Sequence, residues 1–344
     1  MALRVHWFVP SHGDGRDLAG PGRREPDIGY LTAVARAADD VGFHGALIPF
    51  GLFCADPFVV TAALAGATRR LRPMVALRPG LVSPLLAAQQ IATLQQVCGG
   101  RLALNIVIGG DADEQLRYGD TADHDRRYAR ADEFLTVLRE LWRGDPVRHH
   151  GEFYRLDNAF LVRPHEFPEL YVGGSSPQAR RVAARHADCY LAWGETPAAL
   201  AALRAELPDP APRFGTRLHV ITRDTAEEAW AAADELVAGI DPALIARTRA
   251  RFARSESHGQ RRAVALRADG LTPCPNYWLG FGLARPGAGT ALVGSHAEVA
   301  DRIRELHDLG VADLILSGQP HLEEAHRVGE GVLPLLRAAG VLAD

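Results

Sequence analysis

Short apolar runs alternate with amphipathic stretches along almost the whole chain. The runs are typical of buried β-strands, and the stretches between them have the apolar spacing of helices. Two helix starts are especially clear: Thr225 and Glu228 form a capping box, and Ser295 begins a helix that ends at Gly310. The pattern predicts eight strands, at residues 4–10, 43–50, 71–79, 101–109, 170–175, 188–193, 215–223 and 312–318.

This alternation determines the fold class that we expect. Eight strands, each followed by a helix, predict a parallel sheet closed into a (β/α)8 TIM barrel, with residues 1–344 forming one domain. An open doubly wound sheet is the alternative. It is disfavoured because PSHGDG, residues 10–15, stands where a glycine-rich nucleotide-binding turn would follow the first strand.

Two segments interrupt the pattern. Residues 147–161 resemble a β-hairpin, and residues 240–290 form a long insertion that begins helical and charged and then becomes rich in glycine and proline. Insertions at the carboxyl ends of barrel strands lie over the active site. The second segment is therefore expected to cover the site, either as a mobile lid or as a fixed packing arm.

Composition narrows the chemistry. All 38 basic residues are arginine, which excludes a Schiff-base lysine and a Walker-type phosphate loop. The net charge of −4 provides no basic field for nucleic acid. The four cysteines form no CxxC pair, so neither a disulfide framework nor a thiolate metal site is expected. With no signal peptide and no apolar run long enough for a membrane span, we expect a cytoplasmic enzyme.

Polar side chains gather where the predicted strands end. Arg217 and His219 share one face of a strand that has apolar neighbours, where burying charge is costly. A structural ion pair for Arg217 and a core position for His219 are the simpler interpretations. The other residues expected at the barrel mouth are His12, Cys54, Asn105, Trp193, Gln319 and His321, together with Arg285 from the insertion. Two arginines, three histidines and no acidic cluster favour an anionic ligand.

The segment Gly173-Gly174-Ser175-Ser176 precedes a helix that begins at Pro177. Glycines allow a phosphate to approach the backbone, serine hydroxyls donate hydrogen bonds, and a helix N-terminus favours negative charge. The same segment would also serve as an ordinary turn and helix cap. No HxxxH pair or G-x-S-x-G motif occurs, which argues against a zinc enzyme and a serine hydrolase.

Ten segments in order resemble the flavin-dependent alkanesulfonate monooxygenases of the bacterial luciferase-like superfamily, over nearly the whole chain. They are HGDG (12–15), LIPFGLFCAD (47–56), SPLLAAQQIATL (83–94), HDRRYARADEF (124–134), GGSS (173–176), WGE (193–195), RLHVI (217–221), FARSESHGQRR (252–262), GAGTALVG (287–294) and SGQPHLEEAHRVGE (317–330).

The resemblance implies a homo-oligomeric barrel, a dimer or tetramer, that uses reduced FMN (FMNH2) supplied by a separate NAD(P)H-dependent FMN reductase. It implies that oxygen adds to the reduced flavin and that the resulting peroxyflavin attacks an organosulfonate, giving an aldehyde and sulfite.

The resemblance also implies residue roles. The FMN phosphate would contact Ser175, Ser176, Arg127 and Tyr128; the flavin would contact Asn105 and Glu114, with Cys54 nearby; and the sulfonate pocket would contain His12, Trp193, Arg217, His219, Arg285 and His321. Arg217 and Arg285 would clamp the sulfonate, and His219 would donate a hydrogen bond or shuttle a proton. Simpler structural roles, such as packing, capping or an exposed helix turn, stay open for each of these residues.

One departure concerns Gln319, where the family pattern has tyrosine. Glutamine cannot release a proton as a phenol can. This difference leaves open a related enzyme that oxidises a sulfone or another small substrate. An oxidoreductase dependent on the deazaflavin F420 and a non-catalytic flavin-binding protein are further alternatives.

Overall fold

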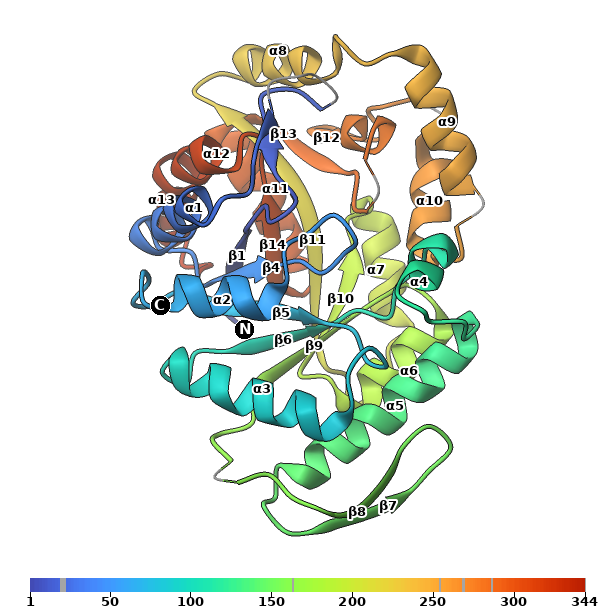
Figure 1. Ribbon diagram of the computed structural model, residues 1–344. Coiled ribbons are helices and arrows are strands. Elements are labelled where there is room, and N and C mark those ends of the chain that lie inside the picture. The colour runs from blue at the N-terminus through green and yellow to red at the C-terminus, as the bar shows by residue number, and fades with distance from the viewer. Residues whose placement is uncertain (19–22, 163, 254, 268–269, 286, 344) are drawn as a thin grey trace.

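Eight parallel strands form a closed barrel in the computed structural model (Figure 1), which describes residues 1–18, 23–162, 164–253, 255–267, 270–285 and 287–343. The barrel strands are β1 (Arg4–Phe8), β4 (Gly45–Ile48), β5 (Arg72–Leu77), β6 (Ala103–Ile106), β9 (Glu169–Gly173), β10 (Cys189–Trp193), β11 (Arg213–Arg223) and β14 (Val311–Ser317). They lie in the order β10-β9-β6-β5-β4-β1-β14-β11, and pairing of β10 with β11 closes the ring. The predicted (β/α)8 TIM barrel is confirmed.

Helices surround this barrel, and most begin at a side chain that caps the backbone. The helices are α1 (Ile28–Val41), α2 (Pro57–Ala65), α3 (Pro84–Val97), α4 (Ala112–Arg117), α5 (His124–Leu141), α6 (Pro177–His186), α7 (Pro197–Ala205), α8 (Ala226–Val237), α11 (His296–Asp308), α12 (His321–Arg327), the π-helix η3 (Val328–Val332) and α13 (Leu333–Ala338). The predicted capping box at Thr225 is present, and Ser295 forms a second one with Glu298.

A strand that the sequence pattern did not predict, β13 (Ala291–Ser295), adds to the sheet outside the ring. Strand β11 is long enough for two sets of partners. Its first part pairs with β10 and β14, and the stretch from His219 to Arg223 pairs with β13 in parallel. Thr290, just before β13, donates a 2.7 Å hydrogen bond to the carbonyl of Gly194, just after β10. Along the second half of β11, strand β13 therefore takes the place that β10 has beside the first half.

Both predicted interruptions are present. The hairpin comprises β7 (Val147–His150) and β8 (Arg155–Ala159). The long insertion contains α9 (Pro242–Ala253), α10 (His258–Leu266), β12 (Tyr277–Trp278) and the 3₁₀-helix η2 (Gly280–Leu283); its positions 254, 268–269 and 286 lie outside the described residues. The short strands β2 (Asp14–Gly15) and β3 (Arg23–Arg24) form a further antiparallel pair. Figure 1 shows α9 and α10 beside the barrel, far from the hairpin β7–β8.

The amino end of the barrel is filled by a charged network. Asp313, at the start of β14, is fully buried and accepts hydrogen bonds from Tyr171 (2.9 Å) and Arg213 (3.0 Å). It also lies 3.1 Å from Nε2 of His6. Arg213 forms a second ion pair with Glu169. In such barrels the active site lies at the opposite end, where the strands finish. This network at the amino end is therefore a structural element.

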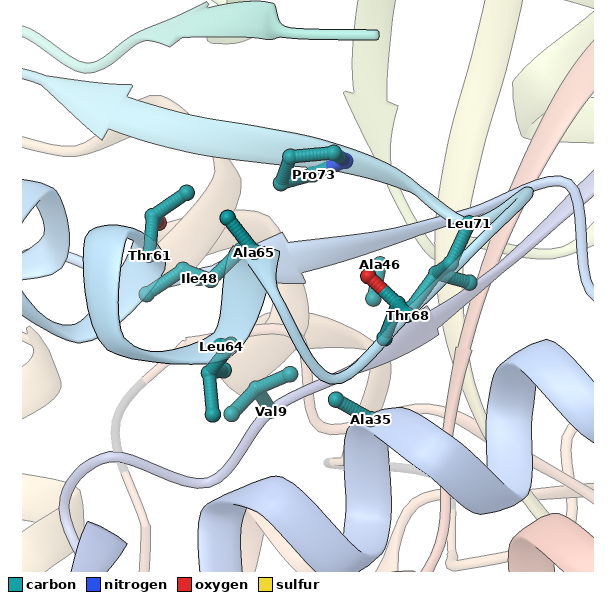
Figure 2. A pocket seen from close by; sticks show the side chains of 10 residues that line it. All are labelled: Val9, Ala35, Ala46, Ile48, Thr61, Leu64, Ala65, Thr68, Leu71 and Pro73. Carbon is teal, nitrogen blue, oxygen red and sulfur yellow. The ribbon is translucent and has the colours of Figure 1, made fainter. Parts of the chain in front are cut away.

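A small cavity lies outside the barrel wall, between α2 and strands β4 and β5 (Figure 2). Its volume is about 20 Å³, enough for about one water molecule. The lining side chains are Val9, Ala35, Ala46, Ile48, Thr61, Leu64, Ala65, Thr68, Leu71 and Pro73. None of these side chains is titratable, so the cavity is a packing feature.

Candidate active site

The ring of Phe8, at the end of β1, brings three predicted residues together at the carboxyl end of the barrel. The guanidinium carbon of Arg217 lies 4.2 Å from the ring centre. The rings of His321 and His12 lie 5.6 and 6.0 Å from it. Phe8 itself was not predicted as a site residue, because an apolar side chain in a strand is indistinguishable from core in the sequence.

Arg217 carries its charge inside the barrel. Burial lowers the pKa of its guanidinium to about 10, which still leaves it protonated at neutral pH. Among the residues that the structure describes, no carboxylate forms an ion pair with Arg217, and its Nε atom has no hydrogen-bond partner. The simpler interpretation, a structural ion pair within the barrel, therefore has no support in this part of the chain. The guanidinium is available to an anion.

His219 is held more tightly than the sequence indicated. Its Nε2 donates to the carbonyl of Ala288 at 2.9 Å, its Nδ1 lies 2.9 Å from the hydroxyl of Ser317, and its ring stacks on Phe281 with centroids 3.8 Å apart. Burial, together with the nearby charge of Arg217, holds the pKa of His219 well below its ordinary value of 6.5. His219 is a neutral imidazole with both ring nitrogens engaged, so a proton-shuttle role requires one of these bonds to open.

His321 is paired with Asp14, a residue that was quoted within HGDG but not assigned a role. The backbone N–H of His321 donates to Asp14 at 2.6 Å, and its Nδ1 lies 3.1 Å from Oδ1 of the same carboxylate. The side chain of Gln319, two residues before His321, donates a hydrogen bond to the carbonyl of Asp17 at 2.6 Å. Its Oε1 is buried without a partner in the described part of the chain.

A second carboxylate at the mouth, Glu114, organises the loop after β4. It accepts hydrogen bonds from the backbone of Leu52 (2.8 Å) and from Arg78 (3.2 Å). Arg78 is buried over the ring of Phe50 and was missed by the sequence analysis. Burial raises the pKa of the neighbouring Cys54 thiol, so the side chain is a thiol and not a thiolate at neutral pH.

The sequence predicted no acidic cluster at the mouth, yet two carboxylates lie there. Asp14 and Glu114 are both present there, but each is paired, one with His321 and the other with Arg78. Arg78 offsets the charge of Glu114, and the charge of Asp14 faces His321. The guanidinium of Arg217 keeps its positive charge, and the mouth still favours an anion.

The residues after β9 form a glycine turn that leads into α6. The hydroxyl of Ser175 is buried and unpaired among the described residues, whereas Ser176 caps α6 by accepting from Ala179 at 3.1 Å. At Gly174 a Cβ atom would lie 2.8 Å from the Tyr128 hydroxyl, and φ is +138°. Only glycine permits this close approach. The unpaired hydroxyl, the glycine turn and the start of a helix together fit a phosphate group.

On the same face of the barrel, Asn105 in β6 presents a buried Oδ1 atom that has no partner among the described residues. A buried polar atom left unpaired costs about 1–3 kcal/mol. Bound ligand atoms would remove that cost, so Asn105 and Ser175 fit a phosphate-bearing cofactor that spans the two positions.

The insertion packs directly on the predicted site. Arg127 donates to Glu256 of the insertion (2.5 Å) and to the carbonyl of Ala122 (2.6 Å), so its predicted contact with a phosphate stays a prediction. Gly259 of α10 lies against the indole of Trp193, where a Cβ atom would come within 2.8 Å of the ring. Arg285 is close enough to His219 for its charge to disfavour protonation of the imidazole.

Two other findings bear on function. In the described ranges, no group of three or more His, Cys, Asp or Glu side chains is arranged to hold a metal ion. No helix in the same ranges is long and apolar enough to cross a membrane.

Residues 3–313 match the family model described as luciferase-like monooxygenase. The chain belongs to the luciferase-like monooxygenase family. The broader part of the resemblance, membership of the luciferase-like superfamily, is confirmed.

Solved structures of other enzymes share the fold of this family member. Riboflavin lyase (RcaE), solved with modified FMN and riboflavin, is 21% identical with a TM-score of 0.82, over 100% of this chain and 93% of that one. EDTA monooxygenase (EmoA) from Chelativorans sp. BNC1 is 21% identical with a TM-score of 0.81, over 100% and 95%. An F420-dependent secondary alcohol dehydrogenase is 18% identical with a TM-score of 0.69, over 97% and 99%.

Proposed function

We propose that this protein is an FMNH2- and O2-dependent monooxygenase that converts an organosulfonate to an aldehyde and sulfite. The observation that carries the proposal is the partly buried guanidinium of Arg217, which forms no ion pair with any described residue and lies at the same end of the barrel as Ser175 and Asn105, whose buried polar atoms have no partner in the described part of the chain. One part of this end suits an anion, and the other suits a phosphate-bearing cofactor.

The cofactor side is argued from those unpaired atoms. Ser175, Tyr128 and the start of α6 would hold the phosphate of FMN, and Asn105 would contact its ring. Reduced FMN supplies the two electrons with which O2 is activated. We propose that an NAD(P)H-dependent FMN reductase delivers it as a partner protein. A structural relative was solved with modified FMN, which is consistent with FMN as the cofactor.

The substrate side is argued from permanent charge. A sulfonate stays ionised at all physiological pH values, so an arginine that stays protonated over the same range is a suitable partner. Arg217 would hold one face of the sulfonate and Arg285 the other. In a site that excludes water, the same charges also stabilise negative charge that develops during the reaction. A relative named for EDTA, which is itself a polyanion, supports an anionic substrate.

Sulfite release provides the test. The enzyme would be mixed with an FMN reductase, NADPH and air, and sulfite would be measured across a panel of alkanesulfonates of different chain length. We expect sulfite from at least one of them, with loss of at least about 100-fold in kcat/KM for Arg217→Met. No sulfite from any sulfonate, with FMNH2 bound normally, would refute the proposal.

A second candidate keeps the cofactor and changes the substrate to a sulfone or another small compound. It rests on Gln319, which is buried, held by Asp17 and unable to act as an acid. The variant Gln319→Tyr separates the two possibilities. A gain of activity on simple alkanesulfonates would assign Gln319 to substrate choice. Oxygen-independent turnover with F420 would instead favour the deazaflavin alternative, to which a structural relative belongs.

A further inference from the structure

Asp14 is a fully buried carboxylate directly beneath the proposed site. It has four polar neighbours, of which three donate hydrogen bonds to it. Its Oδ1 accepts from the backbone of Gly15 at 2.8 Å, and its Oδ2 accepts from the backbone of His321 at 2.6 Å and from the Tyr30 hydroxyl. The fourth neighbour is Nδ1 of His321, 3.1 Å from Oδ1. The carboxylate is therefore fixed in one orientation, against one histidine.

Asp14 is an ionised carboxylate at neutral pH. Burial opposes ionisation, but the charge of His321 and the hydrogen bonds from His321 and Tyr30 hold the pKa of Asp14 well below its usual range. Tyr30 cannot take over the charge, because burial and the neighbouring Asp14 raise the pKa of its phenol. The contact between Nδ1 of His321 and Asp14 is an ion-pair approach, because this nitrogen forms no hydrogen bond with any described residue.

The imidazole of His321 connects this carboxylate to the site. Its ring packs on Phe8 at 5.6 Å, and Arg217 lies over the same Phe8 ring. With Nδ1 turned to Asp14, the other nitrogen, Nε2, points away from the carboxylate. The charge of His321 also contributes to the low pKa of His219, which places the two imidazoles close together on the side of the mouth.

We propose that Asp14 is a positioning residue that keeps a proton on Nδ1 of His321 and thereby directs Nε2 into the site as a base. In a catalytic triad a buried aspartate orients its histidine through a hydrogen bond to Nδ1; here the carboxylate lies 3.1 Å from Nδ1 and would act through its charge. The destination of the proton rests on the proposed function. When a carbon bearing a sulfonate becomes a carbonyl carbon, its new oxygen atom comes from O2, and the two electrons of reduced FMN reduce the second oxygen atom to water. The C–S bond breaks, and sulfite departs with the bond electrons. A C–H proton must also leave, and Nε2 accepts it, giving an imidazolium that Asp14 stabilises.

The charged groups around the pair are compatible with this role. On the outer side, Tyr30 donates to Asp14, and Arg24 forms an ion pair with Glu323, which together close the pair off from solvent. On the inner side lie the permanent charge of Arg217 and the neutral His219, with Arg285 and His12 nearby. His321 is the group among these that is positioned both to exchange a proton and to face an ionised carboxylate.

The first test needs neither flavin nor substrate. The full-length protein is labelled with 15N-histidine, and the His321 ring signals are assigned from their absence in His321→Gln. In the wild type we expect a proton on Nδ1. In Asp14→Asn, which keeps the shape but loses the charge, we expect the neutral ring to carry its proton on Nε2. A wild-type spectrum without a proton on Nδ1 would overturn the proposal, whether or not the variant folds.

A matched control separates positioning from general destabilisation. Asp39 is another buried carboxylate, which accepts three backbone N–H groups from Arg69, Arg70 and Leu71 far from the mouth. The same change there, Asp39→Asn, should reduce stability and leave the His321 signals unchanged. If Asp39→Asn moves those signals as much as Asp14→Asn does, the proposal fails.

The second test uses turnover. Asp14→Asn should lower kcat for sulfite release at least about 100-fold, the range expected for loss of a proton-transfer group, with KM and FMN affinity within about threefold of wild type. An unchanged kcat would overturn the proposed role. If the ring signals behave as expected but the wild type releases no sulfite, the positioning role of Asp14 stands and the proposed substrate is wrong.

Discussion

Arg217 and Phe8 form a cation–π pair, with the guanidinium carbon 4.2 Å from the ring centre. The pair holds a planar guanidinium in one orientation at the mouth of the barrel. Because β11 supplies the arginine and β1 supplies the ring, the orientation depends on two strands separated by β14 in the sheet. The aromatic ring replaces the carboxylate that most buried arginines have, and it does so without cancelling the charge.

Arg217→Lys is predicted to be far from conservative. Lysine keeps the charge but has neither the flat surface that packs on Phe8 nor the forked donors that match a sulfonate. We expect kcat/KM for the sulfonate to fall at least about tenfold, with FMN affinity unchanged. Phe8→Leu should produce a smaller loss, about 2- to 30-fold, corresponding to a cation–π energy of about 0.5–2 kcal/mol. Equal activity of Arg217→Lys and wild type would contradict the proposed role.

Ser175→Ala is predicted to weaken cofactor binding without lowering the stability of the folded protein. Its hydroxyl has no partner among the described residues, so its removal leaves no hydrogen bond broken in the free protein. A hydrogen bond to a charged phosphate contributes about 1.5–3 kcal/mol, and the Kd for FMN should rise about 10- to 150-fold. Titration with riboflavin, which lacks the phosphate, is the control. A similar loss of riboflavin affinity would place Ser175 elsewhere on the cofactor.

Ser176→Ala should differ from Ser175→Ala in thermal stability, which a melting experiment measures. Ser176 caps α6, and loss of such a cap costs about 1 kcal/mol of stability. We therefore expect the free Ser176→Ala protein to unfold more easily than wild type, whereas free Ser175→Ala does not. The two variants together separate the helix-capping and the phosphate-binding roles of the GGSS segment.

His219 makes stability depend on pH in a defined direction. Its pKa is lowered in the folded protein, so the unfolded chain binds the extra proton first. The stability that the neutral ring contributes is complete above pH 6.5, the ordinary value, and is lost as the pH falls below it, by at most about 1.4 kcal/mol per pH unit. Urea unfolding of wild type and His219→Gln between pH 7 and 5 should show the steeper loss in the wild type. Parallel losses would contradict the assignment.

Asp313→Asn should destabilise the fold and leave substrate recognition intact. The change leaves Arg213 and His6 without their shared buried carboxylate, and breaking such a pair costs about 3–5 kcal/mol. Denaturant unfolding measures the loss, and an unchanged KM would show that the network does not reach the site. The control is Asp157→Asn, whose ion pair with Arg148 is exposed and contributes about 0–1 kcal/mol.

The fold was predictable because the barrel depends on patterns that repeat along the chain. All eight barrel strands were found, since each is a short buried run next to an amphipathic helix. Strand β13 was missed for a physical reason. Its residues, Ala291–Ser295, follow a glycine-rich stretch and pair with the far half of β11, a partner that no local pattern reveals.

The site was predictable where a residue has few other uses. Arginine and histidine on one face of an internal strand indicate a functional site, because burying them is costly. Asp14, Phe8 and Arg78 were missed because their roles depend on partners distant in the chain: Asp14 meets His321, and Arg78 meets Glu114. The same limit hid the engagement of both His219 nitrogens, which involves a backbone carbonyl at Ala288.

The long strand β11 also has an evolutionary consequence. Helix α8 and strand β13, from which the insertion departs and to which it returns, pack against each other through Ala229, Ala233 and Val293. The insertion thus leaves and re-enters the barrel at adjoining, firmly anchored points, and lengthening such a loop costs little free energy, about 0.6 kcal/mol per doubling. The insertion can therefore change in length and sequence at little cost in stability, while the barrel wall that carries Arg217 stays as it is.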